Sequence, residues 1–156
     1  MAAQNDNAGR VINEFVTVTI GNHLFGLPIS RVQDVFVPDR LTRVPLAPPE
    51  VAGILNLRGR VVTAIDMRSR LDLGGRKPGQ PVMAIGIELR GESYGLLVDS
   101  VGEVMKLKSS HCESKPINLE AQLARVAAGI YRLEGQLLVV LDVDRVLDIN
   151  NSAIAA

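Results

Sequence analysis

An internal repeat constrains the fold of this chain more than any other feature of its sequence. Residues 25–35 align with residues 94–104. The identical pairs in this block are Gly26/Gly95, Leu27/Leu96, Val32/Val101 and Val35/Val104, and the pair Asp34/Glu103 is conservative. Because repeated segments usually form repeated structural units, this block predicts two related lobes.

A second block repeats in the same order along the chain, and it aligns residues 53–73 with residues 129–149. Its identical pairs are Gly53/Gly129, Ile54/Ile130, Leu57/Leu133, Gly59/Gly135, Asp66/Asp142, Leu71/Leu147 and Asp72/Asp148. We therefore predict one domain over residues 11–150, with lobes at about 11–76 and 77–150 and polar tails at 1–10 and 151–156. The alignment leaves open whether each lobe is contiguous or the lobes exchange strands.

The local patterns predict short strands joined by turns. Residues 15–20 alternate apolar and polar side chains, which is typical of a half-buried strand. Further strands are expected at 24–27, 60–65, 82–89, 94–98, 101–107 and 136–141, and residues 51–57 are expected to form a strand or a short helix that leads into one. Ser30 is expected to cap a helical turn over 31–35, and residues 144–149 are expected to form a short terminal helix. Short strands between turn signals favour an all-β barrel or sandwich.

The repeat also assigns roles to particular residues. Glycines present in both halves are expected at turns with positive φ. Asp66 and Asp142 each follow an apolar strand, and a helix cap is a better interpretation of them than a catalytic carboxylate. Arg58 and Glu134 occupy equivalent turns with opposite charge, which suits a protein that presents different surfaces to different partners.

Composition argues against several classes of function. The chain has 17 Lys+Arg and 17 Asp+Glu, no Trp, three Phe and two Tyr. A non-specific nucleic-acid binder needs a basic excess, and a single-strand binder needs stacking aromatics. Cys112 is a single cysteine, so no internal disulfide forms, and we expect no signal peptide and no membrane span.

Motifs for catalysis or metal binding are missing from the sequence. It has no G-x-S-x-G elbow, no P-loop and no zinc-spaced Cys/His set. His111 and Cys112 are adjacent, but two ligands do not complete a metal site, and neither residue acquires a role. We expect no cofactor, no metal and no enzymatic activity.

Taken together, the motifs resemble those of the CheW-like domain family, the coupling module of bacterial chemotaxis systems. The most specific segment is Asn56-Leu57-Arg58-Gly59. The resemblance covers nearly the whole chain and rests on residues 25–35, 45–49, 53–62, 65–68, 95–104 and 135–148.

The resemblance implies two small five-stranded β-barrels packed together, with short helices that include one near the C-terminus. It also implies a non-catalytic, cytoplasmic adaptor at membrane receptor arrays, without membrane insertion. Its expected partners are the cytoplasmic tips of methyl-accepting chemoreceptors and the CheW-like regulatory domain of the histidine kinase CheA.

A groove between the barrels would accept a receptor helix through apolar side chains at i, i+3 and i+4. The residues expected to bind the receptor are Val32, Asp34, Val35, Asn56, Leu57, Arg58 and Val101. Within this set, Arg58 could pair with Asp34 or with an acidic receptor group. The kinase contact is expected at apolar barrel ends, without assigned residues.

Two other classes remain as alternatives. An OB-like nucleic-acid binder would show a basic groove with stacking aromatics. A small enzyme with an unrecognised site would show a deep pocket with convergent ionisable residues.

Overall fold

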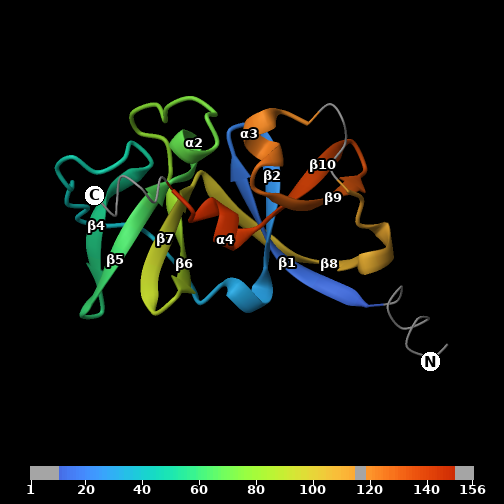
Figure 1. The fold of residues 1–156 in the computed structure, drawn as a ribbon, viewed down its shortest axis with the longest axis horizontal. Helices are drawn as coiled ribbons and strands as arrows, with labels where there is room; N and C mark the ends of the chain where they lie inside the picture. The colour runs from blue at the N-terminus through green and yellow to red at the C-terminus, as the bar shows by residue number, and fades with distance from the viewer. Residues whose placement is uncertain (1–10, 115–118, 150–156) are drawn as a thin grey trace.

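A computed structural model describes residues 11–114 and 119–149, which form strands and very short helices (Figure 1). The elements of the first half are β1 (Ile12–Ile20), β2 (His23–Pro28), η1 (Ile29–Arg31), β3 (Asp34–Phe36), β4 (Val51–Leu57), β5 (Arg60–Asp66) and α2 (Met67–Arg70). Those of the second half are β6 (Met83–Leu89), β7 (Glu92–Val98), β8 (Ser100–Lys108), η2 (Ser109–His111), α3 (Ala121–Ala124), β9 (Ala127–Leu133), β10 (Gln136–Leu141) and α4 (Val143–Val146). The all-β prediction is confirmed.

The strands of the described residues form two five-stranded sheets that exchange strands between the repeats. Sheet A has the order β8-β1-β2-β10-β9, and sheet B has the order β3-β6-β7-β5-β4. In the repeat, strands β1 to β5 correspond to strands β6 to β10 in the same sequence. Replacing each strand by its equivalent converts the order of sheet A into the order of sheet B. Each sheet therefore combines two strands of one repeat with three of the other, and the lobes 11–76 and 77–150 do not coincide with the sheets.

The two sheets are not closed, so the expected term β-barrel describes them only loosely. Their edge strands are β8 and β9 in sheet A and β3 and β4 in sheet B. A single bridge, Thr42 to Ile54, joins the chain beyond β3 to β4. The equivalent bridge in sheet A joins Glu113, beyond β8, to Ile130 on β9. The repeat is thus reproduced even in these isolated contacts.

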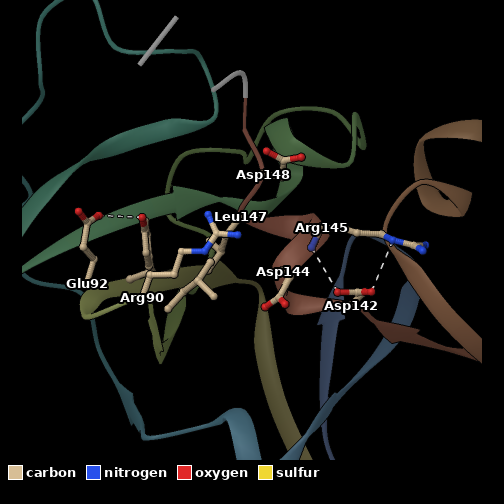
Figure 2. Close-up of a pocket in the computed structure, with 9 residues that line it drawn as sticks. Arg90, Glu92, Asp142, Asp144, Arg145, Leu147 and Asp148 are labelled. Carbon is tan, nitrogen blue, oxygen red and sulfur yellow. Dashed lines mark hydrogen bonds and ion pairs between the residues drawn. The ribbon is translucent and has the colours of Figure 1, made fainter. Parts of the chain in front are cut away.

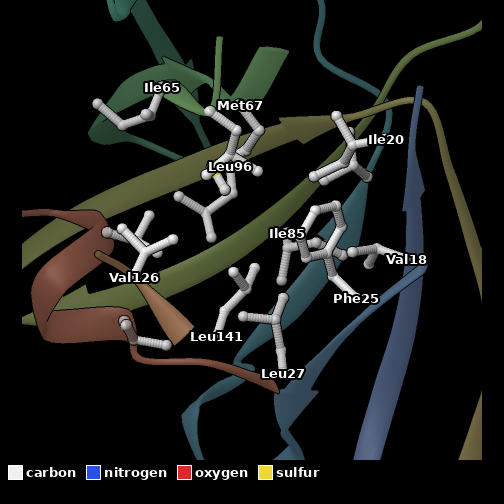
Figure 3. Close-up of a cluster of buried hydrophobic side chains, with 14 of the residues drawn as sticks. Val18, Ile20, Phe25, Leu27, Ile65, Met67, Ile85, Leu96, Val126 and Leu141 are labelled. Carbon is white, nitrogen blue, oxygen red and sulfur yellow. The ribbon is translucent and has the colours of Figure 1, made fainter. Parts of the chain in front are cut away.

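The largest hydrophobic cluster lies between the sheets and not inside either of them. Figure 3 shows Phe25 and Leu27 of sheet A packed with Ile85 and Leu96 of sheet B. Smaller clusters cover the opposite faces, with Leu55 and Val62 on sheet B and Phe15 and Tyr131 on sheet A. These assignments follow from the side-chain alternation along each strand. Since each large apolar side chain that is fully buried stabilises the fold by about 1.5–3 kcal/mol, the shared cluster joins both sheets into one unit.

The segment after β2 differs from the sequence prediction. No side chain caps η1, whose N-cap is Pro28, and Ser30 lies within the 3-10 turn. The helical turn expected over 31–35 is absent, because Asp34–Phe36 form β3 instead. Val32 and Val35 are β-branched residues, which favour an extended backbone. Pairing of β3 with β6 also provides hydrogen-bond partners for the backbone groups of this segment.

The repeated glycines have two different roles, and only one of them was predicted. Gly59 and Gly135 lie in hairpin turns with φ of 84° and 81°, as expected. Gly53 lies within β4, where a Cβ atom would come 2.3 Å from the carbonyl oxygen of Thr42. Gly26 and Gly95 also lie within strands, so close packing and not a turn accounts for them.

Candidate functional site

Two of the predicted site residues, Val32 and Val101, meet the same hydrophobic cluster from opposite repeats. Both side chains are half-buried and pack against the cluster that joins the sheets. Val32 directly follows η1, and Val101 is the second residue of β8. The repeat thus places an equivalent valine beside each point where the chain passes between the sheets.

Val35 is more exposed and lies on the edge strand β3. Its side chain is 41% exposed, and its cross-strand partner is Ile85, which belongs to the central cluster. Val104, its repeat equivalent, is 44% exposed on edge strand β8, opposite Val16 of the same cluster. The predicted set omitted Val104, although the identity Val35/Val104 in the repeat could have identified it.

The polar members of the predicted set meet at the β4–β5 hairpin. Arg58 Nη1 lies 3.4 Å from Asp34 Oδ2, so the expected Arg58–Asp34 pair is confirmed. The Arg58 side chain is 79% exposed and that of Asp34 is 28% exposed. The ion pair therefore joins an acid on edge strand β3 to a base on the β4–β5 hairpin, although β3 and β4 are the opposite edge strands of sheet B.

The hairpin turn explains why Asn56 is present. The backbone N–H of Gly59 donates a hydrogen bond of 2.9 Å to Asn56 Oδ1. Arg58 and Gly59, the two residues between the strands, have φ of 53° and 84°. Positive φ at both positions is typical of a type I′ turn, which matches the twist of the flanking strands.

Leu57 lies apart from the valines. It packs against the cluster on the opposite face of sheet B, together with Phe36. The structure therefore brings Val32 and Val101 to one cluster, Asp34 and Arg58 to one ion pair, and Leu57 to a different layer.

Asp66 and Asp142 have the capping role that the sequence indicated. Asp66 accepts hydrogen bonds from the backbone N–H groups of Arg68 and Ser69 at the start of α2. Asp142 accepts one from the backbone N–H of Arg145 at the start of α4. Both carboxylates satisfy backbone donors that a helix N-terminus leaves free.

A half-buried ion cluster connects α2 to the junction of the sheets. Arg68 donates to both carboxylate oxygens of Asp99, at 2.9 and 2.6 Å, and the Gly21 N–H donates to Asp99 Oδ2 at 2.8 Å. Burial alone would raise the pKa of Asp99, but these hydrogen bonds and the charges of Arg68 and Arg76 lower it below its ordinary value. The hydrogen bond to Asp99 raises the pKa of Arg68. This cluster is the strongest electrostatic feature that the sequence prediction missed.

The cleft between α4 and the β6–β7 hairpin has a volume of about 530 Å³ and is lined by charged side chains (Figure 2). Its charges are engaged locally: Glu92 accepts from the Tyr94 hydroxyl at 2.9 Å, and Arg145 Nε lies 3.5 Å from Asp142 Oδ2. Asp144 accepts from Arg31 at 3.1 Å. These contacts account for Glu92, Asp142, Asp144 and Arg145 as members of structural pairs.

His111 and Cys112 lie on the segment that follows β8. His111 ends η2, and the exposed Cys112 lies against Gly129. Over the residues that the structure describes, no group of three or more His, Cys, Asp or Glu side chains is placed to hold a metal ion. In the same part of the chain, every helix is too short to cross a membrane.

Comparison with known proteins agrees with this arrangement. The chain is 26% identical over 155 residues to the chemotaxis protein CheW of Klebsiella aerogenes, an alignment that covers 99% of this chain and 93% of the relative. It is 28% identical over 139 residues to the chemotaxis protein CheW of Bacillus subtilis, with 89% of each chain covered.

A solved structure shows the same fold. The crystal structure of the scaffolding protein TtCheW from Thermoanaerobacter tengcongensis has a TM-score of 0.80 and 26% identity, and the match covers 90% of both chains. The family model described as the CheW-like domain matches residues 14–150. The two interlocked sheets and their repeated edges are therefore those of a CheW-like domain, and this chain belongs to that family.

Proposed function

We propose that this protein is a non-catalytic chemotaxis adaptor that couples the cytoplasmic tips of chemoreceptors to the histidine kinase CheA. Its family and the chemotaxis and scaffolding proteins that resemble it support this assignment. They favour neither the nucleic-acid-binding alternative nor the enzymatic one. The adaptor would act in the cytoplasm, beside membrane receptor arrays.

The observation that carries the receptor assignment is the pair Val32 and Val101 on one hydrophobic cluster. Val35 and Val104 add exposed apolar surface on edge strands β3 and β8. We propose that these four valines line the receptor groove, and we refer to them as the groove. A receptor helix that places apolar residues at i, i+3 and i+4 matches a strip of aliphatic side chains of this kind.

Charge at the β4–β5 hairpin would add specificity for the receptor. The exposed Arg58 is held near β3 by Asp34, at 3.4 Å, and can instead pair with an acidic receptor side chain. An exposed pair contributes under about 1 kcal/mol to folding stability. The effect of Arg58 is therefore expected in receptor affinity and selectivity.

The kinase requires a different surface, because an adaptor must hold both partners at once. Exposed apolar side chains occur along the segment that follows β3 and on β5: Val37, Leu41, Val44, Leu46 and Val61. We define these five residues as the sheet B patch, which shares no residue with the groove. We assign the CheW-like regulatory domain of CheA to this patch.

Leu46 is the most unusual member of the patch. It is fully exposed and has φ of 64°, a conformation that disfavours bulky L-residues. The backbone bond from Ala47 N–H to the Val44 oxygen closes the turn around it. A strained turn that exposes a leucine is best explained by binding, since solvent gives that side chain no stabilisation.

Co-sedimentation with receptor-containing membranes tests the proposed function. The protein should pellet with these membranes, more completely when CheA is present, because several weak contacts reinforce one another in an array. Kinase activity should rise in the same mixture. A protein that neither pellets nor raises kinase activity would exclude the adaptor function.

Arg58→Glu tests the receptor surface more sharply. Repulsion by Asp34 and loss of the positive charge should weaken receptor binding by about tenfold, which is the effect of 1.4 kcal/mol. The melting temperature should hardly change, because the side chain is 79% exposed. Glu134→Arg, at the equivalent turn of the other repeat, is the matched control. A large loss of stability in Arg58→Glu would instead assign Arg58 a structural role.

A further inference from the structure

The chain passes between the two sheets at two equivalent places. At each place an ion pair, which we call a tie, connects the passage to a short helix. Between β2 and β3 it crosses through residues 29–33, and between β7 and β8 it crosses through Asp99 alone. Arg68 of α2 binds Asp99, and Asp144 of α4 binds Arg31. Arg68 and Asp144 are equivalent in the repeat alignment, and their partners Asp99 and Arg31 lie one position apart in it, so the two ties occupy nearly the same place with the charges exchanged.

The tie at Asp99 is strong and partly shielded from solvent. The Arg68 side chain is 11% exposed, and that of Asp99 is 22% exposed. In addition to the two bonds from Arg68 and the one from Gly21, the Asp99 N–H donates to the Thr19 oxygen at 3.0 Å. Val101 follows two residues later, so its position is tightly determined.

The tie at Arg31 is weak by comparison. One hydrogen bond of 3.1 Å joins Arg31 Nη1 to Asp144 Oδ1, and the Asp144 side chain is 62% exposed. Beyond it, the Gln33 N–H donates to Gly86 at 2.8 Å, and the Gln33 side chain donates to Glu88 at 3.0 Å. Because exposed ion pairs are screened by water and salt, this crossover opens more easily than the one at Asp99.

We propose that the groove has one fixed side and one adjustable side, and that the Arg31–Asp144 pair positions the adjustable side. Val32 is adjacent to Arg31, so release of the pair allows η1 and Val32 to move while Val101 stays in place. Arg31 and Asp144 thus act as positioning residues that determine how closely the groove fits a receptor helix. The role in receptor binding rests on the proposed function, whereas the unequal stability of the two crossovers does not.

Hydrogen exchange of the free protein tests the asymmetry without any partner. Asp144→Asn keeps the side-chain shape and removes the charge, and Glu134→Gln is a control that removes one negative charge at the β9–β10 turn. We expect exchange of the 29–33 segment to rise about threefold in Asp144→Asn only, with residues 99–103 unchanged. Equal exchange of the 29–33 segment in wild type and Asp144→Asn would overturn the proposal.

Binding of a chemoreceptor tip fragment then tests the positioning role. Asp144→Asn should change the affinity for the fragment by about two- to fivefold and leave the affinity for the CheA regulatory domain unchanged. The double variant Arg31→Asp/Asp144→Arg restores the pair with reversed charges and should recover both wild-type affinity and wild-type exchange. If the wild type binds the fragment but Asp144→Asn binds it equally well, the positioning role is wrong. If the wild type does not bind the fragment, the receptor assignment is wrong as well, and the exchange result still decides whether the crossovers differ.

Discussion

The crossover at Asp99 and the crossover at Arg31 are repeat equivalents, yet they differ in burial and bonding. Asp99 accepts three hydrogen bonds from two separate elements, and its partner Arg68 is 11% exposed. Asp144 accepts one bond from Arg31 and is 62% exposed. The repeat thus preserved the place of each tie, while burial and additional hydrogen bonds made the one at Asp99 strong.

The hairpins β4–β5 and β9–β10 show the same principle at the surface. Gly59 and Gly135 keep positive φ in both turns, because the backbone requires it. The residue before each glycine is free to differ, and it is Arg58 in one turn and Glu134 in the other. Of Arg58 and Glu134, only Arg58 has positive φ, so the geometry of the two turns has also diverged.

Removing the carboxylate at each crossover should produce the largest contrast. Asp99→Asn leaves the Arg68 guanidinium without its paired acceptor and should lower the free energy of unfolding by about 3 kcal/mol. Asp144→Asn should lower it by less than about 1 kcal/mol, because its pair is exposed. Urea unfolding of the two variants measures both values, and equal losses would contradict the comparison.

Gly53 on β4 and Gly129 on β9 are repeat equivalents, and we expect them to differ in how strongly a substitution by alanine destabilises the fold. A Cβ at Gly53 would lie 2.3 Å from the Thr42 oxygen, on a residue with φ of 155°, so Gly53→Ala should cost about 2 kcal/mol or more. A Cβ at Gly129 would meet the Cys112 side chain, which is exposed and can rotate away. Gly129→Ala should therefore cost less than about 1 kcal/mol. Thermal unfolding of both variants decides the order, and a larger loss at Gly129 would reverse the interpretation.

Acid should weaken the tie at Asp99 selectively. The lowered pKa of Asp99 means that the unfolded chain binds its proton more readily than the folded protein does. This stabilisation is complete well above the ordinary aspartate pKa of about 3.9 and is lost as the pH falls through the lower, folded-state pKa. The difference in unfolding free energy between wild type and Asp99→Asn should accordingly shrink below about pH 4. A difference that does not change with pH would show that the carboxylate charge contributes nothing.

The smallest effect on stability is expected for a substitution at Leu46. The same substitution also distinguishes the binding role of the sheet B patch from that of the groove. Leu46→Gly removes a fully exposed side chain and relieves its positive φ, so stability should rise by up to about 1 kcal/mol. Affinity for the CheA regulatory domain should fall, whereas binding of a receptor tip fragment should not. Calorimetry of the variant with each partner gives both affinities, and unchanged kinase binding would remove Leu46 from the kinase surface.

Sequence patterns predicted most of the strands, because alternation and turn residues act locally. Residues 15–20 and 136–141 form strands as expected, and Asp66 and Asp142 cap short helices. The prediction over 31–35 was wrong, since pairing with β6 decides that segment and pairing is not a local property. The candidate site was predicted only in part for the same reason: Leu57 packs against the cluster on the opposite face of sheet B from the valines, and only the folded sheet decides that.

By itself, the sequence determined the repeated unit, the all-β class and the valines that the two halves share, because these depend on local periodicity and on comparison within the chain. Only the tertiary structure decided that the repeats exchange strands, that the main core lies between the sheets, and that Asp99 and Arg31 tie equivalent crossovers with unequal strength. Strand partners and burial arise from contacts between distant residues. The energy of a charged pair depends on that burial, which no local pattern records.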